Sequence, residues 1–227
     1  MPIDDKSIHH GHRQRVKKKF KENGIDGFAD HEVLEMLLFY AKDRCDVNPL
    51  AHKLINEFGS LASVFDAPYE QLVAVDDVGD NTAILIKLVP QICRRYLESR
   101  NASIAVTNTE TLGAYIMPSF YGRRQEAIYV VCMDAKGKVI GSKKIADGDN
   151  VSAVLDIANV VKIAMVMKAA EVAIAHNHPS GVAVPSNQDI VATRRLISTL
   201  AAVGVGFLDH IIVADDEFVS LRQSKLI

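Results

Sequence analysis

The chain of 227 residues is long for one domain and suits two domains of ordinary size. Hydrophobic residues make up 48%, enough for a well-packed core, and 26 Lys+Arg against 28 Asp+Glu give a net charge of −2. This balance excludes a whole-protein electrostatic attraction to nucleic acid or anionic lipid, so any DNA contact would depend on a local patch.

The cysteines and the apolar segments indicate in which cellular compartment the protein is expected. Cys45, Cys93 and Cys132 stand far apart without a CxxC pair, which excludes a readable disulfide framework or thiolate zinc site. Residues 1–12 lack the apolar stretch of a signal peptide, and charged residues interrupt the longest apolar segments. We therefore expect a cytoplasmic protein with no membrane partner.

The first hundred residues show helical patterns. Six of the nine residues in Arg13–Lys21 are basic, and Val16 and Phe20 lie four apart, which predicts a short helix with one apolar stripe. This helix presents either a solvated face or a phosphate-contact surface. Apolar spacing, caps and breakers predict further helices over 31–40, 49–58, 60–65, 68–73 and 83–100. We expect an all-helical domain over residues 1–100.

The sequence pattern changes from helical to mixed after 99–108, a polar stretch of small residues that we interpret as a linker. Alternating and β-branched runs predict strands over 126–134, 139–146, 172–176, 205–208, 210–213 and a last edge over 218–221. Helices are predicted over 155–170 and 187–203. Strands with intervening helices indicate an α/β or α+β domain over residues 101–227.

A metal-binding pattern lies in this second domain. His176 and His178 are two apart at a strand end, so both imidazoles project to one face. Ser186 is a good helix N-cap, and Asp189 falls in the first turn of that helix. Three ligands that leave a fourth position open are typical of a catalytic site for one Zn²⁺, although other first-row ions suit the same donors. The alternative is two ordinary histidines, with Asp189 favouring the helix dipole.

These residues resemble a known signature. The loop His176-Asn177-His178-Pro179-Ser180-Gly181, followed by Pro185-Ser186 and Asp189, is similar to that of the RadC family in the JAB/MPN (JAMM) metalloprotease superfamily. The resemblance implies a cytidine-deaminase-like mixed sheet, zinc bound by the two histidines and Asp189, and Ser186 holding an oxyanion. It also implies a peptide or isopeptide substrate and a historical link to DNA repair. Further matching segments are 134–137, 148–150, 193–196 and 208–213, and residues 58–61 and 75–83 resemble the family's helix-hairpin-helix region.

The position of the general base departs from the family pattern. Lys143 stands at the position of the family's catalytic glutamate, and a charged lysine cannot accept a proton. Asp147, the nearest carboxylate of the same strand parity, is four residues on, and Glu171 has the opposite parity to His176. We therefore expect a zinc-dependent peptidase-like hydrolase or, alternatively, a catalytically impaired metal-binding scaffold.

The hairpin also departs from the family pattern. The usual Gly-hydrophobic-Gly turn reads Asp77-Val78-Gly79 here, with Asp76 and Asp80 on either side. Carboxylates repel a phosphate, so a structural or protein-binding hairpin is favoured over a DNA clamp. Binding to branched or single-stranded DNA through Arg13–Lys21 stays a third reading. His210 is expected to be a core histidine rather than a metal neighbour.

Overall fold

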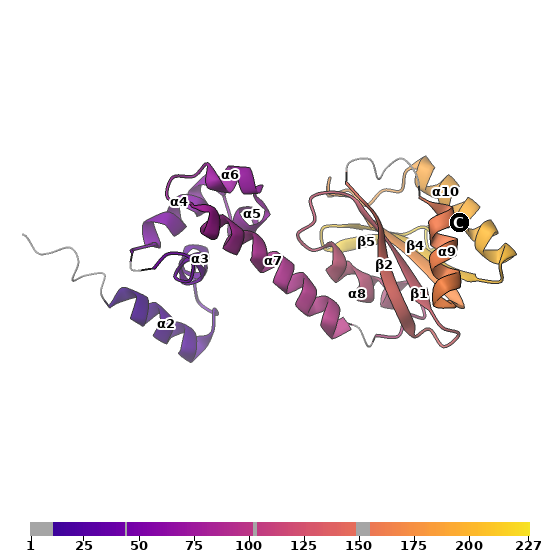
Figure 1. Cartoon of the computed structure of the whole chain (residues 1–227), viewed down its shortest axis with the longest axis horizontal. Coiled ribbons are helices and arrows are strands. Elements are labelled where there is room, and N and C mark those ends of the chain that lie inside the picture. Colours follow the sequence, from indigo (N-terminus) through magenta and orange to yellow (C-terminus); the bar gives the residue numbers. More distant parts are fainter. Residues whose placement is uncertain (1–10, 44, 102–103, 149–154) are drawn as a thin grey trace, which may run out of the picture. The chain divides into compact units, whose positions relative to one another are not determined.

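The computed structural model describes residues 11–43, 45–101, 104–148 and 155–227. The chain forms two compact units, Met1–Gln91 and Ile92–Ile227, which are described separately (Figure 1). The boundary between these units lies inside the long helix α7, Asp80–Asn101. The sequence placed the domain boundary at residues 100 and 101, where this helix ends.

The first unit is helical. Its helices before α7 are α2 (His12–Asn23), α3 (Asp30–Leu38), α4 (Asn48–Phe58), α5 (Leu61–Asp66) and α6 (Tyr69–Val73). Proline in the first turn of α4 and Gly59 at φ 90° beyond its last turn match the expected start and stop. The fully buried side chains at the centre of the unit are Leu34, Leu38, Ala51, Leu54, Val64, Leu72, Ala83 and Ile86.

The second unit is a mixed α+β domain, as predicted from the sequence. Its elements are α8 (Thr109–Ile116), the 3₁₀ turn η1 (Met117–Phe120), β1 (Ala127–Met133), β2 (Val139–Asp147), α9 (Ile157–Met167), β3 (Glu171–Asn177), α10 (Asn187–Ala202), β4 (Gly206–Ala214) and β5 (Glu217–Ser220). The strand order is β2-β1-β3-β4-β5. Among the strand pairs of the described residues, β3–β4 is parallel and the others are antiparallel.

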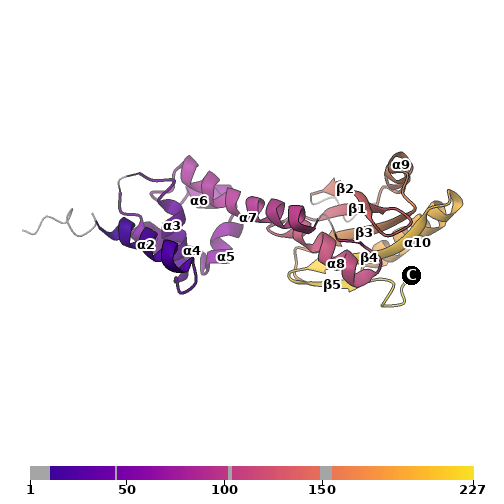
Figure 2. The same ribbon diagram turned by 90° about the horizontal axis from the view of Figure 1, so that it is seen from below.

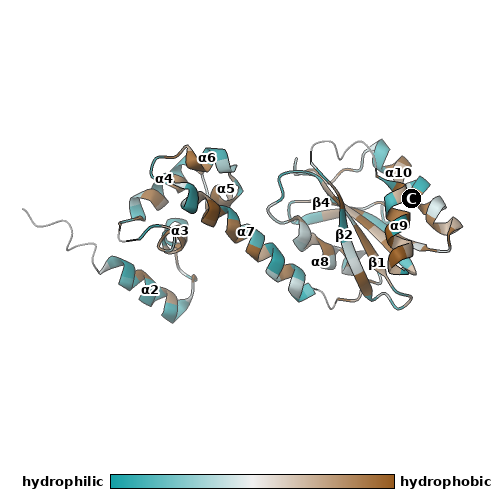
Figure 3. Ribbon diagram, viewed as in Figure 1, coloured by the Kyte–Doolittle hydropathy of each residue, from teal (hydrophilic) through white to brown (hydrophobic). Residues whose placement is uncertain are grey.

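Helices cover both faces of this sheet. Helices α9 and α10 lie on one face and α8 lies on the other (Figures 1 and 2). Along β3, Val172 and Ile174 pack toward α9 and α10, whereas Ala173 and Ala175 pack toward α8. This two-residue alternation places His176 on the face of α9 and α10. Strand β1 is buried along its whole length, and apolar colour is visible on it in Figure 3.

The structure differs from the sequence-based prediction in three places. The strands predicted over 205–208 and 210–213 are one strand, β4, because the buried Asp209 carboxylate finds hydrogen-bond donors inside the fold and need not break it. Helix α8 and η1 were not predicted. The expected linker 99–108 starts within α7, and its Val106 is fully buried, with its N–H bonded to the Gly137 carbonyl at 2.8 Å.

Candidate metal centre

The two histidines of the signature are held at the C-terminal end of β3. His176 is opposite Ile128 of β1 and Ile212 of β4, so strands on both sides fix its backbone. The His178 N–H donates to the Val213 carbonyl at 2.8 Å, which extends the β4 pairing one step into the loop. The strand therefore delivers both imidazoles from a rigid support.

The carboxylate comes from the start of α10. Ser186 is the N-cap, and its hydroxyl accepts from the Asp189 N–H at 3.1 Å. In return, Asp189 Oδ2 accepts from the Ser186 N–H at 2.8 Å and from the Ser186 hydroxyl at 2.7 Å. This capping box leaves Asp189 Oδ1 turned toward the histidines, 3.6 Å from His176 Nε2.

The structure brings the three predicted ligands together. Nε2 of His176 lies 3.0 Å from Nε2 of His178, and one donor atom from each of His176, His178 and Asp189 lies within 4.8 Å of the others. Among the residues that the structure describes, this is the one group of three or more His, Cys, Asp or Glu side chains with such convergence.

Hydrogen bonds at the far side of each ring indicate where its proton sits. His178 Nδ1 lies 2.9 Å from the Val182 carbonyl, which can only accept, so Nδ1 carries the proton. His176 Nδ1 lies 2.8 Å from His210 Nε2. With the His176 proton also on Nδ1, both Nε2 atoms would present bare lone pairs to each other at 3.0 Å. Such a contact is repulsive unless a cation lies between the nitrogens.

Burial keeps the inner histidine neutral. It lowers the pKa of His176 to about 4; the Asp189 carboxylate opposes this shift and His178 adds to it. Burial, with a smaller effect of the two neighbouring histidines, also lowers the pKa of His210 far below its usual value. A neutral imidazole is the form that binds metal, so His176 is in its metal-binding form near pH 7.

The donor set fits zinc. Two nitrogens bound to one tetrahedral zinc at roughly 2 Å would lie about 3.3 Å apart, close to the 3.0 Å between the two Nε2 atoms. One carboxylate oxygen, Oδ1 of Asp189, completes three protein donors, while Oδ2 is held by Ser186. Three donors of this kind match a zinc site with one open coordination position.

The site has a buried polar support that sequence patterns did not reveal. His210 is buried, as expected of a core histidine, yet its ring contacts His176 directly and Thr193 Oγ1 at 2.6 Å. The Asn177 side chain accepts from the Ala127 N–H at 2.8 Å and donates to the Gln125 carbonyl at 3.2 Å, so it locks the entry of β1 beside the site. The available signal for His210 was its place on an apolar strand, which does not indicate its neighbours.

Lys143 lies on the same face of the sheet as His176. It is opposite Val130, which is opposite Ile174 on β3. His176 is therefore two residues further along the sheet and two strands away from Lys143, roughly 12 Å between Cα atoms from ordinary strand spacings. Lys143 is exposed. Burial raises the pKa of the Cys132 thiol to about 11, and the positive charge of Lys143 opposes this rise.

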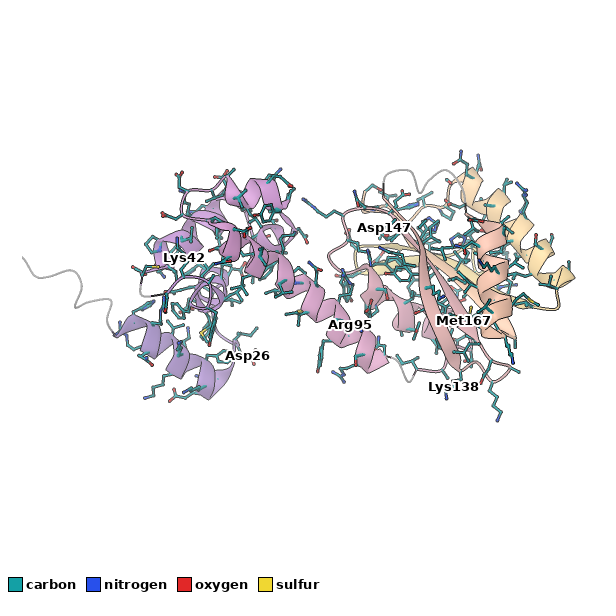
Figure 4. The ribbon with its side chains drawn as sticks, viewed as in Figure 1. Asp26, Lys42, Arg95, Lys138, Asp147 and Met167 are labelled. Carbon is teal, nitrogen blue, oxygen red and sulfur yellow. The ribbon has the colours of Figure 1, made fainter. Side chains whose placement is uncertain are left out.

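Asp147 faces away from the candidate metal ligands, despite its matching parity in the sequence. A β-bulge at Ile145 shifts the register between Lys144 and Ala146, so Asp147 is opposite Ala127 on the α8 face. Its carboxylate pairs with Lys144 and lies 3.8 Å from Arg123 (Figure 4, where Asp147 is labelled at the end of β2). Asp147 cannot replace the missing glutamate from this position.

The basic helix of the first unit is largely engaged within its own unit. Arg13 donates to the Lys42 and Cys45 carbonyls at 3.0 Å, and Lys19 bonds both oxygens of Glu32 at 2.9 Å. Lys18 pairs with Glu22, and Lys17 lies over the Tyr40 ring. These contacts use four of the six basic side chains of Arg13–Lys21, so DNA binding through this segment stays a prediction.

The acidic turn before α7 adopts a glycine-like backbone. Asp77 has φ 70°, in the left-handed region that a helix-hairpin-helix motif usually fills with glycine. Lys42 Nζ donates to the Asp77 carbonyl at 2.5 Å, and Lys53 pairs with Asp76 at 3.0 Å. Two lysines of the same unit thus hold this turn in place, which favours a structural role for it over DNA binding.

The fold and the site together define a class of protein. A mixed sheet with helices on both faces carries a His-x-His pair at the end of a central strand and an aspartate in the first turn of the next helix, the arrangement of a JAB-type domain. A family model described as "RadC-like JAB domain" matches residues 106–226, so the chain belongs to the RadC-like JAB family.

A curated relative covers nearly the whole chain. The "UPF0758 protein FN0909" of Fusobacterium nucleatum subsp. nucleatum is 31% identical over 225 residues, which span 96% of this chain and 97% of the relative. The similarity therefore includes the helical first unit as well as the JAB domain. In the part of the chain that the structure describes, no helix has the length and apolarity needed to cross a membrane.

Proposed function

We propose that this chain binds one zinc ion through His176, His178 and Asp189 and acts as a zinc-dependent hydrolase of peptide or isopeptide bonds. The observation that carries the proposal is the 3.0 Å contact between two Nε2 atoms, whose rings have other partners at Nδ1. Zinc held there would supply Lewis acidity toward a carbonyl and would lower the pKa of a coordinated water.

The remaining residues of the site suit the handling of a carbonyl substrate. Ser186 and the first N–H groups of α10 lie at a helix N-terminus, which favours developing negative charge. The Ser186 hydroxyl donates to Asp189 Oδ2 in the structure, so stabilisation of an oxyanion requires it to exchange that acceptor for the substrate oxygen. Val182 and Val184, exposed on the loop between the ligands, offer apolar contacts to a substrate side chain.

A second candidate function is a metal-holding scaffold without hydrolysis. It is favoured by Lys143 at the family's glutamate position and by the bulge that turns Asp147 to the opposite face. Loss of a general base typically lowers the rate by about 10²–10⁴-fold. The two candidates share the zinc site and differ only in the activity of the natural chain.

Metal analysis joined to a peptidase assay tests both candidates. We expect one zinc per wild-type chain, and loss of zinc from the His176→Ala/His178→Ala double variant. His31→Ala is the matched control, because His31 stacks on His52 in the first unit, remote in sequence from the site. Zinc retained by the double variant would overturn the site.

The activity arm compares wild type, Lys143→Glu and Lys136→Glu on unstructured and isopeptide-linked substrates. Lys136 lies exposed in the β1–β2 turn and controls for the change of charge. Zinc-dependent activity in wild type supports the hydrolase. Activity only in Lys143→Glu supports the scaffold, and activity in neither variant nor wild type contradicts the hydrolase on these substrates.

A further inference from the structure

A buried chain of hydrogen bonds connects the two elements that carry the metal ligands. Thr193 Oγ1 donates to the Asp189 main-chain carbonyl at 2.6 Å and lies 2.6 Å from His210 Nδ1. On its other side, His210 Nε2 lies 2.8 Å from His176 Nδ1. Thr193, His210 and His176 are all buried, with 0%, 3% and 4% of their surface exposed.

The direction of this chain follows from the number of protons available. The Asp189 carbonyl can only accept, so the single Thr193 hydroxyl proton is directed to it. His210 Nδ1 must then donate to the Thr193 oxygen, which leaves His210 Nε2 as an acceptor. His176 Nδ1 must therefore donate to His210. His176 Nε2 is left with its lone pair, on the side where His178 and Asp189 lie.

We propose that Thr193 and His210 are positioning residues for the metal site: they hold the ring proton of His176 on Nδ1, so that Nε2 can bind the cation. This inference rests on the zinc site proposed above. Neither residue touches the reacting atoms; each acts through His176.

The two ligand histidines differ in how much support this assignment needs. His178 Nδ1 faces the Val182 carbonyl, an acceptor under all conditions, so its proton position is fixed locally. His176 faces another imidazole, which can either donate or accept. Only the threonine hydroxyl, itself oriented by the Asp189 carbonyl, makes His210 an acceptor. Hydrogen-bond partners of this kind typically change metal affinity by about 10–100-fold.

The test removes the hydroxyl without changing the side-chain shape. In Thr193→Val, His210 loses the partner that fixes its Nδ1 proton and can present Nε2–H to His176, which would move the His176 proton onto the metal-binding nitrogen. Thr193→Ser keeps the hydroxyl and is the matched control. Thr193→Ala replaces the valine variant if circular dichroism shows that the latter does not fold.

Two readouts are needed. Long-range ¹H–¹⁵N spectra of the metal-free full chain report the tautomer of each histidine ring, and chelator competition reports zinc affinity. We expect Nδ1–H His176 in wild type and Thr193→Ser, a shift toward Nε2–H in Thr193→Val, and zinc binding weakened about 10–100-fold in that variant. A purely structural role of Thr193 would lower the melting temperature and leave the tautomer unchanged.

The results separate this inference from the proposed function. An unchanged His176 tautomer in Thr193→Val, or zinc affinity within twofold of wild type, would overturn the positioning role while the zinc site stands. If wild type binds no zinc, the proposed function fails, and with it the claim that this proton placement serves a metal. The tautomer spectra would then still decide whether Thr193 orients the His176 proton.

Discussion

Asp209 is the buried carboxylate whose removal should most disturb the second unit. It is fully buried in β4, next to His210, and accepts hydrogen bonds at both oxygens. Oδ2 accepts from the hydroxyls of Thr109 and Ser220 at 2.6 Å, and Oδ1 accepts from the N–H groups of His210 at 2.7 Å and Arg222 at 3.2 Å. The carboxylate therefore joins α8, β4, β5 and the C-terminal segment.

We expect Asp209→Ala to lower the free energy of unfolding of this unit by about 3 kcal/mol. The buried His210 N–H would lose its partner, which costs about 1–3 kcal/mol, and each hydroxyl would lose a charge-assisted bond worth about 1 kcal/mol after rearrangement. Relief of carboxylate desolvation offsets part of this loss, and water can replace the bond to the N–H of the exposed Arg222. Asp209→Asn keeps one acceptor oxygen, and the hydroxyls can turn to accept from its amide, so we expect a loss of about 1 kcal/mol.

Hydrogen exchange of β4 amides, followed by mass spectrometry, measures this effect in the full chain without interference from the helical unit. Urea unfolding followed by circular dichroism provides a second measurement, because the chain contains no tryptophan. A loss below 1 kcal/mol in Asp209→Ala, or an equal loss in Asp209→Asn, would refute the reasoning.

Three further predictions concern the proposed metal site. Burial lowers the pKa of His176 to about 4 from an unfolded value near 6.5, so the unfolded chain binds more protons between these pH values. The free energy of unfolding of the metal-free protein should therefore fall by about 3 kcal/mol as the pH falls from 6.5 to 4. Urea unfolding across this range should show a weaker dependence of that free energy on pH in His176→Asn. Ser186→Ala should lower the free energy of unfolding by about 1 kcal/mol through the lost N-cap, and it should weaken zinc binding by releasing Asp189 Oδ2. Ser186→Thr should keep both the N-cap and the hydrogen bond to Asp189. Equal zinc affinity of the alanine and threonine variants in chelator competition would argue against a role of Ser186 in orienting Asp189. Zinc at 100 times its dissociation constant should stabilise the second unit by about 2.7 kcal/mol in thermal unfolding, and a melting temperature that does not respond to zinc in wild type would contradict a folded-state site.

Local patterns in the sequence identified the three candidate ligands and the element that carries each of them. Residues two apart on a strand share a face, which aligned His176 with His178, and the S-x-x-D cap brought Asp189 to the first turn of α10. Hydrophobic periodicity similarly placed most helices and strands within a few residues of their observed ends, and the resemblance identified the family that the comparisons establish. These features depend on neighbours within about one turn or one strand.

Only the tertiary structure decided the surroundings of those ligands. The partner of Asp209 on α8, Thr109, lies 100 residues away in the chain, and Thr193 meets His210 from a different element. The bulge at Ile145 reversed the face of Asp147, because one extra residue in a strand shifts the alternation of every side chain after it. Hydrogen-bond direction and strand register are properties of packed elements. A sequence pattern that identifies candidate metal ligands therefore does not determine which ring nitrogen of each histidine carries the proton.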